Sequence, residues 1–300
     1  MQEIIVPGAY NYIALFLTLH CNYQCSYCLN YFGEFKLHDR HLSGEDWVRG
    51  LNRIVTRADL PVTLQGGEPS LHKDFIYIIN HLKPELNIDI LTNLQFDIDE
   101  FIRKVKPARL RRNAPYASIR VSFHPEAMNL EETVNKTLKM LNAGFSIGIW
   151  GLLHPRYEEA ILKAKFICEK YGIDFRTKEF LGRYDGKLYG TYRYSGACQN
   201  KVMQDVSCKT TELILGPDGY IYRCHSDLYA ERMPIGYILD EDFSIIDDYR
   251  MCYFFGRCHP CDIKIKTNRF QQYGYTSVNI KLKDEREKDI TYPACKPQAL

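Results

Sequence analysis

The sequence predicts an α/β fold in which six parallel strands curl into a full or partial barrel, followed by a cysteine-rich region. Two observations support this prediction. Strand-like and helix-like patterns alternate through residues 12–180, whereas the rest of the chain has little long-range periodicity. Most cysteines lie in that second part, after residue 197. We therefore expect the chain to divide into residues 1–180 and residues 181–300.

Each expected strand of the first part is a short apolar run, and each expected helix has local start or stop signals. The expected strands cover residues 12–19, 61–65, 87–92, 118–123, 145–153 and 173–178. The expected helices cover residues 43–56, 73–82, 97–105, 130–142 and 156–171. Ser43 is a typical N-cap, and Gly144 follows the 130–142 helix where a left-handed cap residue belongs.

The second part is expected to be mostly irregular. Residues 182–197 are rich in Gly and Tyr and are predicted as a loop. The segment Tyr184–Tyr194 is either part of a substrate pocket or a surface loop that packs on its own tyrosines. Residues 212–223 predict a hairpin that turns at Pro217-Asp218-Gly219. Such a region, poor in regular structure and rich in cysteine, is typical of a chain wrapped around a metal centre.

Composition and charge exclude several classes of protein. Lys plus Arg number 39 and Asp plus Glu number 37, which gives a net charge of +2 and argues against a nucleic-acid partner. No apolar run is long enough for a membrane span, and the N-terminus lacks the pattern of a signal peptide. We expect a cytoplasmic protein with no membrane partner. The basic run from Lys104 to Arg112 is expected to be a solvated face.

The cysteine count is unusual for such a chain. There are 11 cysteines, an odd number, and no export signal. In a reducing compartment such a set indicates metal binding or catalysis more than a disulfide framework. One group lies near the N-terminus and another fills the last third of the chain, which suggests two metal sites.

The first group is Cys21-x3-Cys25-x2-Cys28, directly after the first expected strand. Three thiolates on one short loop can hold three irons of a cubane iron–sulfur cluster and leave the fourth iron open. A zinc site is the alternative, and it would need a fourth ligand such as His20 or His38.

Other polar or glycine residues follow the later strands. Gly66-Gly67-Glu68 follows the second strand, Asn93 the third and His124 the fourth, with Ser122 near the end of the fourth. The carboxyl ends of the strands of a parallel barrel carry the active site. We therefore expect these residues to meet the cysteine loop there.

The cysteine triplet, with Tyr27 before its last Cys, together with Gly66-Gly67-Glu68-Pro69, resembles the radical S-adenosylmethionine (radical SAM) superfamily over residues 12–180. The resemblance implies a partial (β/α)6 TIM-type barrel and a [4Fe–4S] cluster on Cys21, Cys25 and Cys28. Its open iron would bind S-adenosyl-L-methionine (SAM), and an electron would cleave SAM to a 5′-deoxyadenosyl radical that takes hydrogen from the substrate. An electron donor such as flavodoxin or ferredoxin would then be a partner.

The same resemblance suggests which residues contact SAM. Gly66 and Gly67 would let the backbone approach the methionine ammonium, and Glu68 would place a carboxylate near it. Tyr27 lies where the family has an aromatic beside the adenine. Asn93 and Ser122 are candidates for the ribose or carboxylate; a turn Asn and a strand Ser are the structural alternatives. The stretch 148–151 departs from the family's adenine motif.

The second cysteine group resembles the auxiliary-cluster domains called SPASM or twitch. Cys208 is followed by Gly219-x4-Cys224 and, further on, by Cys258-x2-Cys261. The resemblance implies a second [4Fe–4S] cluster on these four cysteines. A structural zinc site with four cysteine ligands is the alternative. Among the remaining cysteines, Cys168 is expected in the core, and Cys198 and Cys295 have no assigned role.

Cys252 has two interpretations. A thiol can return a hydrogen atom to a carbon radical, as in radical SAM epimerases; alternatively, Cys252 is a cluster ligand and displaces one of the four. The C-terminal stretch most resembles epimerases of aminoglycoside sugars, so the expected function is epimerisation of a sugar or aminoglycoside-type small molecule, with Cys252 as hydrogen donor. The alternatives are a maturase that modifies a peptide or protein, and a non-catalytic zinc or Fe–S scaffold protein.

Overall fold

The computed structural model describes residues 2–37, 39–199, 204–266 and 275–282. Cys295, one of the cysteines without an assigned role, lies outside them. The main sheet has nine strands in the order β14-β13-β12-β2-β4-β5-β6-β7-β8.

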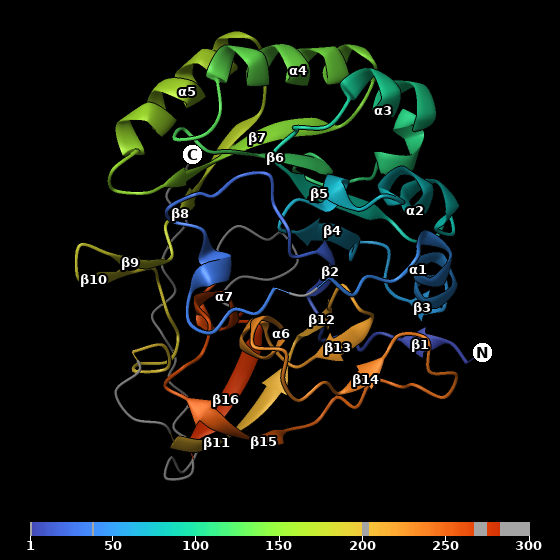
Figure 1. The fold of residues 1–300 in the computed structure, drawn as a ribbon, viewed down its shortest axis with the longest axis vertical. Helices are drawn as coiled ribbons and strands as arrows, with labels where there is room; N and C mark the ends of the chain where they lie inside the picture. Colours follow the sequence, from blue (N-terminus) through green and yellow to red (C-terminus); the bar gives the residue numbers. More distant parts are fainter. Residues whose placement is uncertain (1, 38, 200–203, 267–274, 283–300) are drawn as a thin grey trace.

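Six neighbouring strands of this sheet are parallel, and the chain visits them in order. They are β2 (Tyr12–Thr18), β4 (Val62–Gly66), β5 (Ile88–Thr92), β6 (Ile119–Phe123), β7 (Ile147–Leu153) and β8 (Phe175–Glu179). The helices α1 (Gly44–Leu51), α2 (Phe75–His81), α3 (Ile98–Lys104), α4 (Leu130–Asn142) and α5 (Glu158–Lys170) lie in an arc on the outer side of the strands (Figure 1). The predicted α/β fold with a partial (β/α)6 barrel is confirmed.

Local capping explains where the helices begin and end. The Ser43 side chain accepts a hydrogen bond from the Asp46 N–H at the start of α1. Asn129 caps α4 in the same way, and Gly144, at φ +90°, follows its end. Helix α1 ends earlier than expected, because the chain continues into β3 (Ile54–Val55), which pairs with β1 (Ile4–Ile5). Short 3-10 turns cover Leu29–Tyr31, Pro69–Leu71 and Pro107–Leu110.

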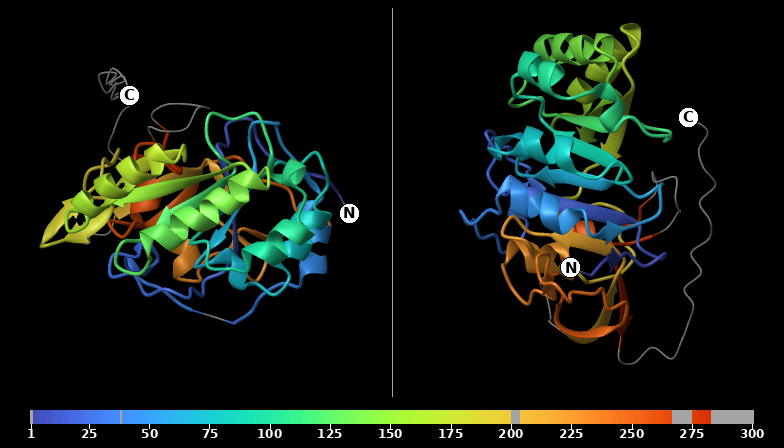
Figure 2. Two further views of the ribbon diagram at one scale, coloured as in Figure 1. Left: turned by 90° about the horizontal axis from the view of Figure 1, so that it is seen from above. Right: turned by 90° about the vertical axis from the view of Figure 1, so that its right-hand side faces the viewer.

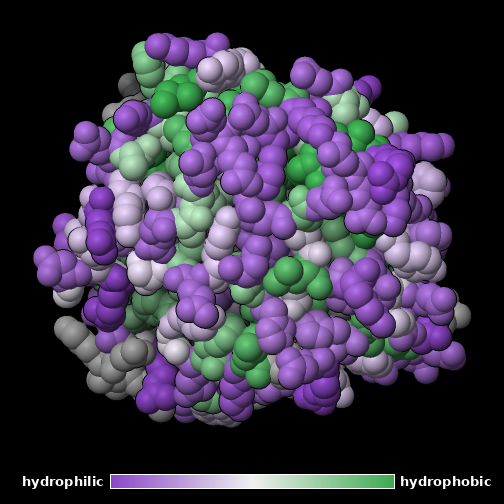
Figure 3. Space-filling model, turned by 45° about the horizontal axis from the view of Figure 1, so that its top comes forward, coloured by the Kyte–Doolittle hydropathy of each residue, from purple (hydrophilic) through white to green (hydrophobic). Residues whose placement is uncertain are grey.

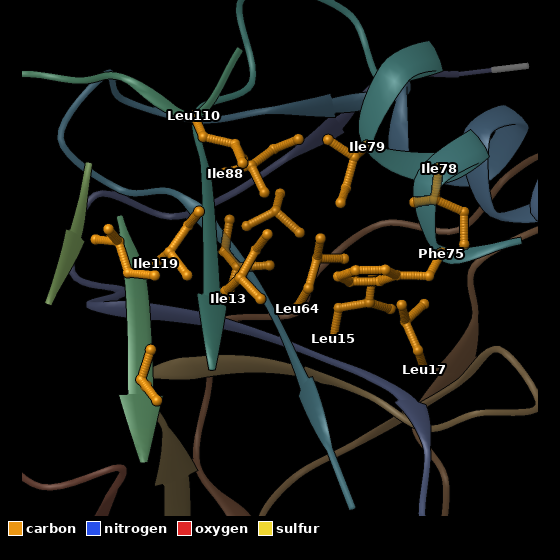
Figure 4. Packing of buried hydrophobic residues seen from close by; sticks show 14 of the residues in the cluster. Ile13, Leu15, Leu17, Leu64, Phe75, Ile78, Ile79, Ile88, Leu110 and Ile119 are labelled. Atoms are coloured by element: carbon orange, nitrogen blue, oxygen red, sulfur yellow. The ribbon is translucent and has the colours of Figure 1, made fainter. Parts of the chain in front are cut away.

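The main core lies between the sheet and the helices. Alternate side chains of β2, including Ile13, Leu15 and Leu17, pack with Leu64 of β4 against Phe75 of α2 (Figure 4). The intervening side chains of β2, which are Tyr12, Ala14 and Phe16, point to the other face of the sheet. They form a second apolar cluster with residues of the second part of the chain. The helices thus bury one face of the sheet, while the other face is available to the second part of the chain and to a site.

The second part of the chain extends the same sheet. Strand β12 (Glu212–Leu215) pairs parallel with β2, β13 (Tyr220–Tyr222) forms the predicted hairpin with β12, and β14 (Gly236–Tyr237) follows. Gly219 has φ +87° in the hairpin turn. Strands β11 (Gln204–Thr210), β15 (Arg250–Phe255) and β16 (Val278–Leu282) form a separate sheet with β11 in the middle. The short helices α6 (His225–Tyr229) and α7 (Pro260–Ile263) complete this part (Figures 1 and 2).

Two expectations are corrected. Residues 182–197 are not all loop, because β9 (Gly182–Tyr184) and β10 (Lys187–Tyr189) form a hairpin. Asp185 and Gly186 both have positive φ, as a two-residue type I′ turn requires.

The basic run from Lys104 to Arg112 is not a solvated face throughout. Arg109 donates hydrogen bonds to backbone carbonyls, and the Arg112 side chain is buried against Asp89.

The surface is mostly polar on the face that Figure 3 shows, with hydrophobic side chains scattered between hydrophilic ones. None of the described helices combines the length and the apolar character needed to cross a membrane.

Candidate active site

A cleft at the carboxyl ends of the parallel strands collects the first group of predicted site residues. It has about 1170 Å³ of empty space, counted out to its open mouth. The thiols of Cys21, Cys25 and Cys28 line it. It is also lined by all the residues expected to contact SAM, which are Tyr27, Gly66, Gly67, Glu68, Asn93 and Ser122. These predicted residues come from four separate segments of the sequence and line one cavity.

The two glycines lie against the chain that leads into the cysteine loop. Gly66 has φ +149°, and a Cβ there would collide with the Thr18 carbonyl oxygen. A Cβ on Gly67 would collide with the His20 carbonyl oxygen. The Gly67 N–H donates to the Thr18 carbonyl at 2.9 Å. Close packing of two backbone segments therefore requires glycine here, in addition to any approach of a ligand.

Glu68 is almost fully buried, and its carboxylate accepts hydrogen bonds from neighbouring residues of the protein. It accepts hydrogen bonds from the Ser70 N–H and hydroxyl, from the Thr92 hydroxyl at 2.8 Å and from the Asn93 N–H at 2.7 Å. Burial raises the pKa of Glu68, and these hydrogen bonds oppose that shift. The geometry makes Glu68 a link between the exits of β4 and β5.

The cysteine loop is held from two sides. The Asn93 amide Nδ2 donates to Asn22 Oδ1 at 2.6 Å, and the Ser26 hydroxyl donates to Glu126 at 2.8 Å. The Tyr23 N–H points to Cys21 Sγ at 3.4 Å. N–H groups directed at a sulfur stabilise the thiolate form and tune the potential of an iron–sulfur cluster.

Burial raises the pKa of all three thiols, to about 12 for Cys25. In the bare chain they are therefore protonated at neutral pH, and a bound metal would reverse this because it binds thiolates. Among the described residues, no three His, Cys, Asp or Glu side chains converge as a single metal ion needs. A cubane cluster binds each thiolate at a different iron, so three thiols that line one cavity are compatible with it.

Aromatic side chains surround Tyr27 on the β6 and β7 side of the cleft. The Tyr27 hydroxyl lies 3.2 Å from His124 Nδ1, and its ring centroid lies 5.0 Å from that of His154 and 5.5 Å from that of Tyr157. Burial lowers the pKa of His124 to about 4, so this imidazole is neutral at pH 7. Sequence reasoning missed His154, Tyr157 and Glu126, although all three follow the ends of strands, which is the signal that could have found them.

A second cavity lies in the C-terminal part and has about 590 Å³ of empty space. Cys208, Cys224, Cys252 and Cys258 line it. This group differs from the expected one, because it contains Cys252 in place of Cys261. The pairing of β11 with β15 explains the difference: Val206 faces Cys252 and Cys208 faces Arg250, so Cys208 and Cys252 are diagonal neighbours.

The thiols of Cys208 and Cys252 are close enough to share a hydrogen bond, which raises the pKa of Cys208 and lowers that of Cys252. The Asp227 N–H points to Cys224 Sγ at 3.4 Å. Burial raises the pKa of Cys224 and of Cys258. The Cys258 thiol adds to the rise at Cys224, and the Cys252 thiol adds to the rise at Cys258. These four cysteines therefore form one electrostatically connected group.

Cys261 lines the first cleft together with Cys21, Cys25 and Cys28. Helix α7 carries it, and Asp262 anchors α7 to α6 by accepting hydrogen bonds from the backbone N–H and Nδ1 of His225, both at 2.8 Å. Burial raises the pKa of Cys261 to about 12. Cys258 and Cys261 are thus on one short segment but line different cavities. Of the other cysteines, Cys168 and Cys198 are buried, Cys168 in the main core.

The fold and the cleft define a class of protein: a partial parallel barrel with a three-thiol loop and a glycine-rich turn at the carboxyl ends of its strands. Residues 15–165 match the family model described as the Radical SAM superfamily. The chain belongs to this superfamily, whose members are enzymes that use a [4Fe–4S] cluster and SAM.

Curated relatives match over part of the chain. A GTP 3′,8-cyclase of Nautilia profundicola is 26% identical over 181 residues, which are 57% of this chain and 56% of that protein. An S-adenosylmethionine-dependent nucleotide dehydratase of Selenomonas ruminantium is 31% identical over 27% of this chain and 29% of its own length. A PqqA peptide cyclase of Rhodopseudomonas palustris is 33% identical over 27% of this chain and 21% of its own length. The chain spans about half the length of the curated relatives it matches, or less.

Among solved structures, native anSMEcpe with bound AdoMet and Kp18Cys peptide has a TM-score of 0.51 at 13% identity, covering 77% of this chain and 78% of that one. At this level of identity the match shows a shared fold.

Proposed function

We propose that this protein reductively cleaves SAM and takes a hydrogen atom from its substrate, with a [4Fe–4S] cluster on Cys21, Cys25 and Cys28. The observation that carries the proposal is that these thiols share one cleft with Tyr27, Asn93 and the Gly66–Glu68 turn. When bound, the cluster and SAM supply the electron and the hydrogen-abstracting radical.

The chain's own residues position and enclose these groups. Glu68 holds the exits of β4 and β5 together, and Asn93 reaches from there to the cysteine loop. Tyr27 offers an aromatic face on the opposite side, next to a neutral His124. Asn93 and Ser122 remain the candidates for polar contacts with SAM. Rigid placement of such groups is what a radical reaction needs, because a misplaced radical attacks the wrong atom.

Anaerobic reconstitution tests this proposal. The reduced protein should release 5′-deoxyadenosine from SAM, and a variant with Cys21, Cys25 and Cys28 all replaced by Ala should release none. Cys168→Ala is the matched control, because it removes a thiol of the main core that lines neither cavity. Full 5′-deoxyadenosine release by the triple variant would contradict the proposal, and binding of zinc without iron would favour the scaffold alternative.

The second cavity supports an auxiliary [4Fe–4S] cluster on Cys208, Cys224, Cys252 and Cys258. The support is that these four thiols line one cavity, with Cys208 and Cys252 close enough to share a hydrogen bond, while Cys261 lines the other cleft. Iron analysis distinguishes the two ligand sets. Cys252→Ala should lose about four of eight irons and Cys261→Ala should keep them. The reverse result would restore the set expected from the sequence.

Epimerisation is the second candidate function, and the position of Cys261 favours it. The hydrogen-donor role expected of Cys252 suits Cys261 better, because Cys261 lines the cleft where the radical would form. Its S–H would break to form a C–H bond, and one electron and one proton from the electron donor and solvent would regenerate the thiol. Turnover in heavy water should place one deuterium in the product, and Cys261→Ala should still cleave SAM without releasing epimerised product.

The names of the relatives include nucleotide and peptide substrates, so both small molecules and peptides are candidates for this chain.

A further inference from the structure

We infer that the substrate is a phosphorylated small molecule, bound at the β8 edge of the main sheet, beside the SAM cleft. This inference rests on the proposed function and names its substrate class. A large cavity there has about 1510 Å³ of empty space, counted out to solvent. Its lining includes the cations Arg120, Lys165, Arg176, Lys178 and Lys264.

The cavity adjoins the SAM cleft along the strands. Ser122 of β6 pairs with Trp150 of β7, and Leu152 of β7 pairs with Lys178 of β8. In each pair the first residue lines the SAM cleft and the second lines the cationic cavity. The two cavities therefore lie on neighbouring residues of the same strands.

Arg120, which lines the cavity, belongs to a buried group with an excess of positive charge. The fully buried Asp89 accepts hydrogen bonds from Arg112 Nε and Nη2, both at 2.8 Å, and from Arg120 Nη2 at 3.1 Å. The two arginine side chains are only 3% and 11% exposed, so two guanidinium groups share one carboxylate. Within the part of the chain that the structure describes, Arg120 Nε is buried without a hydrogen-bond partner. An uncompensated buried cation is costly, and a bound anion near Arg120 would relieve that cost.

The acidic residues of the cavity do not cancel this charge. Five cationic side chains line it against two acidic ones, Glu169 and Asp174. Asp174 pairs with Arg176 at 3.0 Å, and Glu169 lies 3.8 Å from Lys165. A polycation such as an aminoglycoside would be repelled here, whereas arginine and lysine side chains together suit phosphate groups.

Aromatic side chains contribute to the lining of the cavity. The side chains of Tyr116 and Trp150 are on the same wall, with guanidinium groups over their rings at 4.8 Å for Arg112 and 5.9 Å for Arg176. Lys264, the residue that ends α7, closes the cavity from the C-terminal part. A pocket with aromatic walls and a few convergent charges is typical of a small-molecule site.

Direct binding to the reconstituted holoenzyme tests the inference. The probes are tripolyphosphate, GTP, neomycin and an oligoglutamate peptide, measured by calorimetry with SAM present. Tripolyphosphate and GTP should bind saturably, and neomycin and the peptide should not. Arg120→Gln and Lys264→Gln should each weaken GTP binding by about tenfold or more. Lys104→Gln, an exposed helix lysine, is the control and should leave binding unchanged.

Several results would overturn the inference. Binding of neomycin or oligoglutamate in preference to GTP would assign another substrate class. Unchanged GTP binding in Lys264→Gln would show that the ligand binds elsewhere. Arg120 pairs with the buried Asp89, so Lys264→Gln also serves as the test if Arg120→Gln does not fold. Because binding is measured without turnover, failure here leaves SAM cleavage intact, whereas failure of the proposed function would appear as loss of 5′-deoxyadenosine.

Discussion

Asp89 is the carboxylate that pairs with the buried guanidinium groups of Arg112 and Arg120. Asp89→Asn would leave two buried guanidinium groups without a counter-charge. We expect it to lower the free energy of unfolding by about 3–5 kcal/mol. Urea unfolding measures this change, and Asp99→Asn is the control because its partner Lys139 and its own side chain are exposed. Equal effects of the two substitutions would show that the Arg112–Asp89–Arg120 group does not stabilise the fold.

Gly67 is the residue that keeps the cysteine loop against the β4 exit. In Gly67→Ala the new methyl group meets the His20 carbonyl, so the loop must shift. A shift of this kind should lower 5′-deoxyadenosine production by about tenfold or more. Gly8→Ala is the control, since no atom lies near a Cβ at that position. Normal SAM cleavage in Gly67→Ala would show that the cysteine loop tolerates displacement.

His124 should make stability depend on pH. Its folded pKa is lowered to about 4 from 6.5, so the neutral imidazole is favoured by folding. The stabilising contribution is full above pH 6.5 and is lost as the pH falls toward 4. In His124→Gln the fall in melting temperature between pH 7 and pH 5 should be smaller than in the unchanged protein. An identical pH profile would exclude His124 as the source.

The site residues that the sequence predicted depend on local spacing. Cys21, Cys25 and Cys28 share one loop, and the Gly66–Glu68 turn ends a recognisable strand. That Cys252 and not Cys261 lines the second cavity was one of two alternatives that the sequence left open. The choice between them depends on how β11 and β15 pair across more than forty residues. The burial of Arg112 was missed for the same reason: Asp89 lies on another element.

Elements are predictable where their ends are chemically marked. Helix α4 has the predicted bounds, because Asn129 caps its start and Gly144 follows its end. The sheet of β11, β15 and β16 was not predicted, since no local signal specifies strand pairing at long range. The β9–β10 hairpin did carry a local signal, Asp185-Gly186, that the sequence interpretation did not use.

The cap of α4 gives a prediction at this scale. Asn129→Ala removes the acceptor of the Glu132 N–H and should destabilise the protein by about 1 kcal/mol. Asn135→Ala, on the exposed side of the same helix, should be neutral or slightly stabilising, because Ala has the higher helix propensity. Thermal or urea unfolding of both variants makes the comparison. A larger effect at Asn135 would contradict the capping role.

At the scale of the whole molecule, the two parts of the chain share one sheet. Strand β12 covers the edge of β2, and Tyr12, Ala14 and Phe16 pack with Ile214 and Tyr222. A fragment of residues 1–180 should therefore expose a strand edge and an apolar face, and should aggregate or bind a hydrophobic dye. Recovery of a soluble, monomeric fragment with native circular dichroism would contradict this expectation. That residues 1–180 and 181–300 are separate domains stays a prediction.

Helix α7 restricts how this protein can diversify. The segment from Cys258 to Lys264 contributes a thiol to the second cavity, a thiol to the SAM cleft and a lysine to the cationic cavity. An insertion or deletion within these few residues would disturb all three at once. New substrate preferences are therefore more easily acquired on β7 and β8, whose inward-facing side chains can vary one at a time, and the α7 segment should change least among descendants of this protein.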